Sequence, residues 1–212
     1  MSATLTNLTT KGAVNMTWGE IQIESLKKMF LNKEILKVEN LKTYKEDKKY
    51  KTYLDTMPQA CNEAINYIIN LEPIIKVKEL EKTTENCIYD LKEIFKDYNY
   101  KKFYNINTEY SVEWELLTKN LIKINEWKQG KIDVYFETYP KKITEATDNS
   151  TEIELEETFA RIIPLYIAGE LYKDDDLTLS TMYMNEFMTN LNSMIDNNSI
   201  NNNIQSTYRM EL

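Results

Sequence analysis

The chain of 212 residues contains no histidine, two cysteines, four glycines and four prolines. Without histidine it lacks the commonest general base and metal ligand of proteins, and no Ser–His or Cys–His pair can be assembled. Cys61 and Cys87 are not in Cys-x-x-Cys spacing, so we expect neither a disulfide framework nor a zinc site, and a reducing intracellular compartment is the simplest interpretation. The glycines are too widely spaced for a phosphate-cradling motif.

Long apolar runs and an excess of positive charge are also missing. No apolar stretch approaches the ~20 residues of a membrane span, and the first residues lack the basic and apolar regions of a signal peptide. The net charge of −8 argues against a protein that grips a nucleic-acid backbone, although DNA can pass an acidic surface without binding it. From these absences we expect no enzyme, no cofactor, no metal and no membrane partner.

The most apolar part of the sequence is a predicted helix from Phe159 to Leu171, which is apolar on nearly every side. Such a helix is typical of the buried centre of a domain. Asp174, Asp175 and Asp176 follow as an acidic turn, and a second periodic stretch ends at Ile195. We interpret one aspartate as the N-cap of this second helix. The alternative is a divalent metal site, although EF-hand spacing is missing.

Two further helices are predicted near the N-terminus. The capping box Thr17-x-x-Glu20 begins a helix that should end at about residue 31. Apolar residues at alternating steps of four and three form one stripe from Tyr50 to Leu71, with Pro58 inside it and Pro73 after it. Pro58 should kink this helix or mark the start of its second half. Between the two helices we expect a short helix around residues 35–41.

From Pro73 to about Thr147 the apolar period changes to two, which predicts short, half-buried antiparallel strands. The alternating apolar residues are Ile75 and Val77; Val112, Trp114 and Leu116; Ile122 and Ile124; and Ile132, Val134 and Phe136. Tyrosine and phenylalanine are dense in this region, as suits a small sandwich that needs large side chains to fill its core.

This order predicts an α+β fold, an antiparallel helical bundle with an inserted small antiparallel β-sandwich domain. The expected parts are an N-terminal arm at 1–16, the first part of the helical domain at 17–72, the inserted β domain at 73–152, the second part of the helical domain at 153–196 and a C-terminal tail at 197–212. The two ends of the insertion must lie close in space, which is the usual condition for a tolerated insertion.

The tail is rich in asparagine and cannot build a core alone, so we expect it to be disordered or ordered by a partner. Its sparse apolar residues are candidate anchors for a partner: Ile200, Ile204, Tyr208, Met210 and Leu212. The methionines of the preceding helix fit either an adaptable interaction face or a helix core. These methionines are Met182, Met184, Met188 and Met194.

The strand region also fits two other functions. Its tyrosines and tryptophans, including Trp114 and Trp127, are also typical of a platform that binds glycan or a cell-surface ligand. Glu113 and Glu115 lie on one face of a predicted strand, where they fit either a glycosidase carboxylate pair or, more simply, a solvated face. A core that needs aromatic filling remains the plainer interpretation of the aromatic residues.

Residues within 161–190, IIPLYIAGELYKDDDLTLSTMYMNEF, resemble the C-terminal helix pair of head-to-tail connector (adaptor) proteins of tailed double-stranded DNA phages. The shared pattern is an apolar LPLYIAxxLYxDDD helix followed by a helix with YxNEF. Residues 53–58 with 62–64 look like the second helix of that family, and 131–144 look like the last strand and exit of a β insertion. The resemblance touches most of residues 17–195.

The resemblance implies a structural virion protein that forms a ring, a dodecamer matched to the portal beneath the capsid vertex. The helical bundle would build the ring, the tail would reach the portal protein, and the ring would dock neck or tail completion proteins. DNA would pass through the lumen without specific binding. We therefore expect assembly in the host cytoplasm and a place in the head–tail connector or neck. The net negative charge agrees with a lumen that repels DNA.

Overall fold

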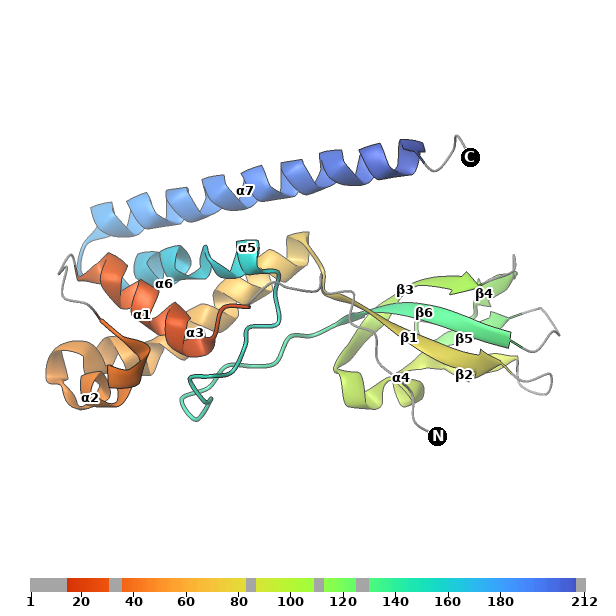
Figure 1. Cartoon of the computed structure of the whole chain (residues 1–212), viewed down its shortest axis with the longest axis horizontal. Coiled ribbons are helices and arrows are strands. Elements are labelled where there is room, and N and C mark those ends of the chain that lie inside the picture. Colours follow the sequence, from red (N-terminus) through yellow and green to blue (C-terminus); the bar gives the residue numbers. More distant parts are fainter. Residues whose placement is uncertain (1–14, 31–35, 83–86, 109–112, 125–129, 209–212) are drawn as a thin grey trace. The chain divides into compact units, whose positions relative to one another are not determined.

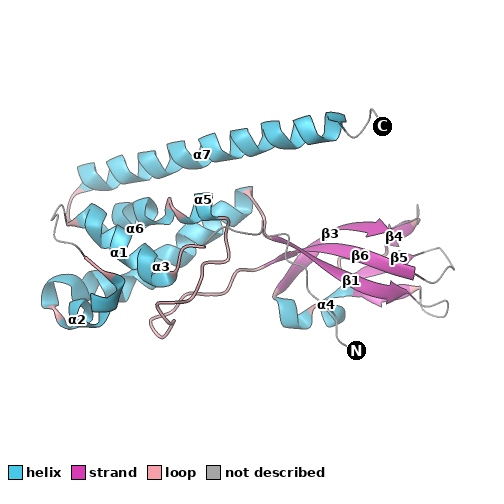
Figure 2. Ribbon diagram, in the orientation of Figure 1, coloured by secondary structure: helices cyan, strands magenta, loops and turns pink. Residues whose placement is uncertain are grey.

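A computed structural model describes residues 15–30, 36–82, 87–108, 113–124 and 130–208 (Figure 1). The chain divides into two compact units, a strand unit that contains Pro73–Lys141 and a helical unit formed by Gly12–Glu72 and Lys142–Leu212. Both sheets lie in the strand unit, and all the helices except α4 and η2 lie in the helical unit (Figure 2). The predicted α+β class is therefore confirmed, with two three-stranded antiparallel sheets.

The helical unit is built around α6. Its elements are α1 (Trp18–Met29), η1 (Val38–Asn40), α2 (Leu41–Glu46), α3 (Lys48–Leu71), α5 (Glu157–Ala160), α6 (Ile163–Leu171) and α7 (Leu177–Tyr208). Helix α6 packs against α1, α3 and α7. Six of its nine residues are buried, including Ile163, Leu165 and Ile167. The prediction of a central apolar helix is confirmed, because a helix without a polar face is stable only when neighbours cover it.

The start of α1 and the stripe of α3 also follow the sequence. The Glu20 amide donates to Thr17 Oγ1 over 3.3 Å and the Thr17 amide donates to Glu20 Oε2 over 2.8 Å, which is the predicted capping box. Helix α3 is continuous through Pro58, and its stripe is buried from Tyr50 to Ile68. The last stripe residue, Leu71, is 48% exposed instead, because it lies where the helix ends.

Two helical predictions are wrong in position. The short helix expected around residues 35–41 occurs later, as η1 and α2 between Val38 and Glu46. The apolar helix expected from Phe159 onward is split, because α5 ends at Ala160 and α6 begins at Ile163. Pro164 lies in the first turn of α6, where its missing amide hydrogen costs no intrahelical bond, so it favours a new helix start.

The strand unit holds the sheets β1–β6–β3 and β2–β5–β4 around one aromatic core. Its elements are β1 (Ile75–Lys82), β2 (Ile88–Asp90), α4 (Leu91–Ile94), η2 (Lys96–Tyr98), β3 (Tyr100–Thr108), β4 (Trp114–Leu116), β5 (Leu121–Ile124) and β6 (Gly130–Thr138). Phe95 and Phe136 stack at the centre with 4.1 Å between ring centroids. Ile122 and Val134 are fully buried beside them.

The predicted alternation holds for β6, whose Ile132, Val134 and Phe136 are buried, but fails at two edge strands. In β4, Trp114 and Leu116 are exposed rather than half-buried. In β1, Lys76 and Lys78 pair in register with the core residues of β6, and Ile75 and Val77 do not. Lysine stems can cover apolar surface while the ammonium group stays outside, and Lys78 Nζ lies 4.7 Å from the Tyr98 ring centroid. Val112 lies outside the described residues.

The chain returns from the strand unit through residues 142–153, here called the return segment, which belongs to the helical unit. The Trp18 amide donates to the Thr151 carbonyl and the Gly19 amide donates to the Asn149 carbonyl, both over 2.8 Å. These bonds satisfy amides at the start of α1 that have no intrahelical acceptor. The insertion therefore ends at Lys141, earlier than the expected boundary at 152.

Candidate partner-docking site

The acidic turn before α7 is built from side chains with separate structural tasks. Asp176 Oδ1 accepts hydrogen bonds from the amides of Thr178 and Leu179, over 2.9 and 3.0 Å, so the N-cap interpretation is confirmed. Asp175 Oδ2 accepts a hydrogen bond from the Tyr53 hydroxyl of α3 over 3.2 Å. Within the described part of the chain, no three acidic or cysteine side chains are grouped closely enough to hold a metal ion.

Two tyrosines join α7 and the turn before it to the end of α1. The Tyr172 hydroxyl donates to the Met29 carbonyl, and the Tyr183 hydroxyl donates to the Lys28 carbonyl over 2.7 Å. These carbonyls belong to the last turn of α1, where no intrahelical donor follows. Partial burial is the main cause that raises the pKa of both tyrosines, so both stay protonated donors at neutral pH. They are the tyrosines of the LYKDDD and YMNEF segments that carry the family resemblance.

Helix α7 lies close against α6 at Gly169. A Cβ atom at that position would lie 2.9 Å from Met184 Cγ and 3.3 Å from the Met184 backbone nitrogen. Phe187 is fully buried next to this contact and meets the Tyr166 ring edge-on at a centroid distance of 5.2 Å. Of the methionines that fit either a helix core or an interaction face, Met184 is half-buried in this contact, whereas Met182 is 48% exposed.

Three of the five candidate anchors lie in α7, since the helix continues to Tyr208. The expected disordered or partner-ordered tail is therefore helical in its backbone from residue 197 to residue 208. The sequence contains no glycine or proline after Gly169 to end the helix, although its asparagines have low helix propensity. Met210 and Leu212 lie outside the described residues.

The position of the anchors around the helix distinguishes them from the core stripe. At about 100° per residue, positions 200, 204 and 208 lie roughly 220–300° around α7 from Phe187. Leu191, which is also fully buried, follows Phe187 by one turn and shares its side. The three anchor positions thus form a second stripe that winds by about 40° per step, so that positions 200 and 204 lie roughly 140° and 100° from Phe187 and position 208 lies only about 60° from it.

The length of α7 carries these positions past α5 and α6. The helix has 32 residues and spans about 48 Å, whereas α5 and α6 together run only from Glu157 to Leu171. Figure 1 shows α7 extending past both. Residues 197–208, here called the distal part of α7, therefore form a helical segment past α5 and α6, which is suited to binding a separate partner.

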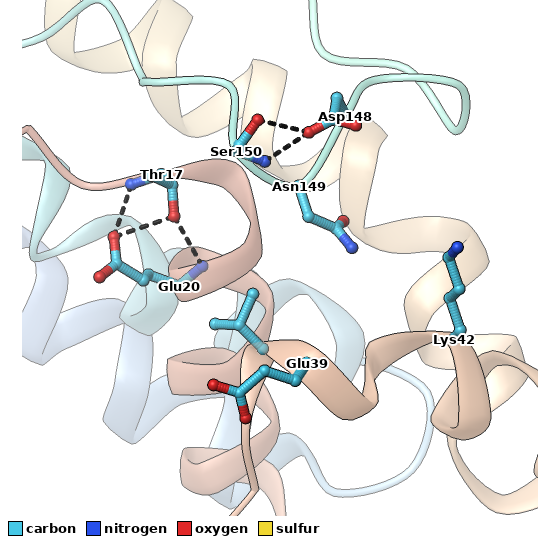
Figure 3. A pocket seen from close by; sticks show the side chains of 8 residues that line it. Thr17, Glu20, Glu39, Lys42, Asp148, Asn149 and Ser150 are labelled. Atoms are coloured by element: carbon cyan, nitrogen blue, oxygen red, sulfur yellow. Dashed lines mark hydrogen bonds between the residues drawn. The ribbon is translucent and has the colours of Figure 1, made fainter.

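A surface depression of ≈ 590 Å³ lies between the start of α1, α2 and the return segment (Figure 3). Its lining residues are Thr17, Glu20, Val38, Glu39, Lys42, Asp148, Asn149 and Ser150. Most of its polar groups hold the fold together: the capping box occupies one side, and Asn149 Oδ1 accepts a hydrogen bond from Gln22 Nε2 over 3.1 Å. Hydrogen bonds from Ser150 lower the pKa of Asp148. We assign this depression a structural role.

The two cysteines lie in different units, Cys61 in the helical unit and Cys87 in the strand unit. Burial raises the pKa of the Cys61 thiol to about 12, so this thiol is not a nucleophile at neutral pH. Cys87 is exposed in the strand unit. Of the two tryptophans considered for a glycan platform, Trp114 is 38% exposed and Trp127 lies outside the described residues.

Comparisons with known proteins add no family assignment. The chain matches no model of a protein family, and a search of curated proteins finds no match. Among the described residues, no helix combines the length and the apolar character needed to cross a membrane.

Proposed function

We propose that this chain is a structural adaptor that joins the portal of a tailed double-stranded DNA phage capsid to the neck and tail. In this proposal a helical bundle with an inserted β-sandwich forms a dodecameric ring, and DNA passes through its centre. The observation that carries the proposal is α7, a helix fixed to the unit at one end and extending past α5 and α6 at the other.

The residues that resemble the adaptor pattern have specific structural tasks in this chain. Tyr172 and Asp176 of the LYKDDD segment bind the end of α1 and cap α7. Tyr183 and Phe187 of the YMNEF segment bind α1 and fill the core. A pattern whose residues orient one long helix supports a family resemblance based on architecture, since none of these contacts requires catalytic chemistry.

The charge distribution also supports the adaptor role. Residues 142–212 contain 4 basic and 13 acidic residues, a net charge of −9, whereas residues 1–141 contain 22 basic and 21 acidic residues, a net charge of +1. The two parts cover the whole chain and sum to −8. Helix α7 contains no lysine or arginine. If residues 142–212 face the lumen, their negative charge keeps DNA mobile by repulsion.

The second stripe of α7 fits the recognition of a helix by a groove. A helix bound in a groove presents apolar anchors at spacings of three and four, and Ile200, Ile204 and Tyr208 are spaced by four. Asparagine has low helix propensity, so the distal part of α7 gains stability when a partner packs against it. We assign the portal protein as that partner, and Met210 and Leu212 as further anchors.

Co-purification with portal rings of the same virus tests the proposal. The double variant Ile200→Asp and Ile204→Asp should lose portal binding, because two carboxylates would be desolvated in an apolar groove. The control, Asn198→Asp with Asn202→Asp, adds the same charge on the side of Phe187 and should retain binding. Deletion of residues 197–212 should also abolish binding while circular dichroism still shows a helical protein.

Retention of portal rings by the aspartate variant at the level of the control would overturn the assignment of the tail. The complex with wild-type protein should show a twelve-fold ring in electron micrographs, placed between the portal and the neck or tail completion proteins. A gene neighbourhood without portal, capsid and tail genes would contradict the wider proposal independently of the tail.

A further inference from the structure

The strand unit has a sheet edge that its own strands leave open. Strand β4 pairs with β5 through Trp114↔Ile124, Glu115↔Lys123 and Leu116↔Ile122, and among the described residues it pairs with no strand on its other side. An edge strand presents unpaired backbone amides and carbonyls to any chain that approaches it. The edge of β4 is therefore a candidate surface for strand addition.

Two of the three residues of this edge strand are apolar and exposed. Trp114 is 38% exposed and Leu116 is 45% exposed, although Ile124 and Ile122, their register partners on β5, are fully buried. Leu117, the next residue, is 42% exposed. The apolar face of this sheet thus continues one strand past the core. A partner that covered these residues would remove their apolar area from water.

An aromatic ring from β3 restricts how Trp114 can be covered. The Phe103 ring of β3 meets the Trp114 ring edge-on at a centroid distance of 5.0 Å, so one side of the indole is already packed. Trp114 is therefore partly covered within the unit, which favours a strand added along the backbone of β4 over a bulky ligand stacked on the indole.

The charges of β4 define the chemistry of the added strand. Glu113 and Glu115 are exposed, and Glu115 is already paired in register with Lys123 on the β5 side. Opposite charges on directly opposed residues stabilise a sheet, and like charges destabilise it. The segment that already pairs with β4, Ile122-Lys123-Ile124, has the order apolar, basic, apolar. A strand on the free side meets the same three side chains and is best matched by the same order.

We propose that the free edge of β4 binds an extended segment of a partner protein as an added strand with an apolar–basic–apolar sequence. Antiparallel pairing of β4 with β4 of a second copy would bring the carboxylates of Glu113 and Glu115 together, which disfavours self-association at this edge. The proposal goes beyond the portal contact, since it gives the inserted strand unit a task of its own. The surface lies in the strand unit and the portal stripe lies in α7, so either assignment can fail alone.

A labelled peptide that contains Leu-Ile-Lys-Ile, the sequence of β5, provides the probe, and the same peptide with Glu in place of Lys is its control. Fluorescence anisotropy with the full chain should show roughly tenfold tighter binding of the lysine peptide. Glu115→Lys should reverse this preference, and Glu115→Gln should reduce it without placing a new charge beside Lys123. Trp114→Ala should weaken both peptides.

Glu81→Lys serves as the matched variant, because Glu81 is an exposed glutamate of β1, an edge strand of the other sheet. This variant should keep the preference of the wild type. Equal binding of both peptides, binding of neither at millimolar concentration, or loss of the preference in the Glu81 variant would each overturn the proposal. A saccharide that quenches Trp114 fluorescence and displaces the lysine peptide would overturn it in favour of a glycan site.

Discussion

Asn62 shows how one side chain can fix a chain connection. Its Nδ2 donates to the Ile143 carbonyl over 2.7 Å, and its Oδ1 accepts from the Ile143 amide over 2.9 Å. Nδ2 also donates to the Pro58 carbonyl of α3 over 2.7 Å. This single amide therefore pairs with both backbone groups of Ile143 and anchors the return segment on α3.

We expect Asn62→Ala to lower the free energy of unfolding by about 1–3 kcal/mol, because it leaves the partly buried polar groups of Ile143 without partners. Urea denaturation followed by circular dichroism measures this loss. Asn66→Ala, on an exposed position of the same helix, is the control and should change the stability little. Equal losses in the two variants would show that the amide of Asn62 does not hold the return segment.

Glu72, at the end of α3, gives a pH-dependent prediction. Burial, and then the nearby carboxylate of Glu156, raise the pKa of Glu72. A carboxyl group whose pKa is higher in the folded protein opposes folding when it is charged, and this cost disappears as the pH falls through the folded pKa. Glu72→Gln should therefore raise the melting temperature at pH 7.

The stabilisation by Glu72→Gln should shrink as the pH is lowered, because protonated glutamic acid and glutamine are then both neutral. Calorimetric scans at several pH values between 7 and 4 check this trend. Glu46→Gln, at an exposed position of α2, controls for the general effect of removing a negative charge from an acidic protein. A benefit that is the same at every pH would contradict a raised pKa at Glu72.

At the scale of elements, the contact between α6 and α7 depends on the absence of a side chain at Gly169. Gly169→Val should lower the free energy of unfolding by about 1–3 kcal/mol, because the new side chain overlaps Met184 and pushes α7 away. Adding Met184→Ala should recover part of the loss, which a double-mutant cycle measures. Gly130→Val is the control, since a Cβ atom at Gly130 meets no heavy atom within 4 Å. Similar losses at both glycines would exclude close packing as the cause.

Elements with a repeated pattern or a specific capping residue could be predicted from the sequence. The capping box at Thr17, the stripe of α3 and the alternation in β6 each express one local rule, and the structure contains all three. Strand β3 lacked such a pattern, because two register irregularities interrupt its pairing with β6. Helix α4 is only four residues long, so no period can be recognised in it.

The candidate site was predictable only where a local sequence pattern marks it. The spacing of Ile200, Ile204 and Tyr208 indicates anchors. The helix that contains these positions was not predicted, because the segment is rich in asparagine, which has low helix propensity. The tyrosine contacts to the Lys28 and Met29 carbonyls depend on where α1 ends relative to α7, which no local pattern contains. The exposed edge of β4 was missed because alternation shows which residues share a face and not whether that face is covered.

At the scale of the whole molecule, the strand unit is an insertion in the helical unit that begins after Glu72 and ends at Lys141. Each unit has a core of its own, around α6 in the helical unit and around Phe95 and Phe136 in the strand unit. The Asn62–Ile143 pairing holds the chain where it re-enters the helical unit. These observations predict that the helical unit folds without the insertion, as is usual when the ends of an inserted domain lie close.

We expect a variant in which a flexible linker of roughly ten residues replaces Pro73–Lys141 to fold cooperatively with a helical circular dichroism spectrum. It should still bind portal rings, because the second stripe of α7 remains, and it should lose the Leu-Ile-Lys-Ile peptide, because β4 is gone. The matched control replaces the insertion and also carries Ile200→Asp and Ile204→Asp, so it should bind neither. If the variant folds but no longer binds portal rings, the strand unit makes the portal contact and the assignment to α7 is contradicted.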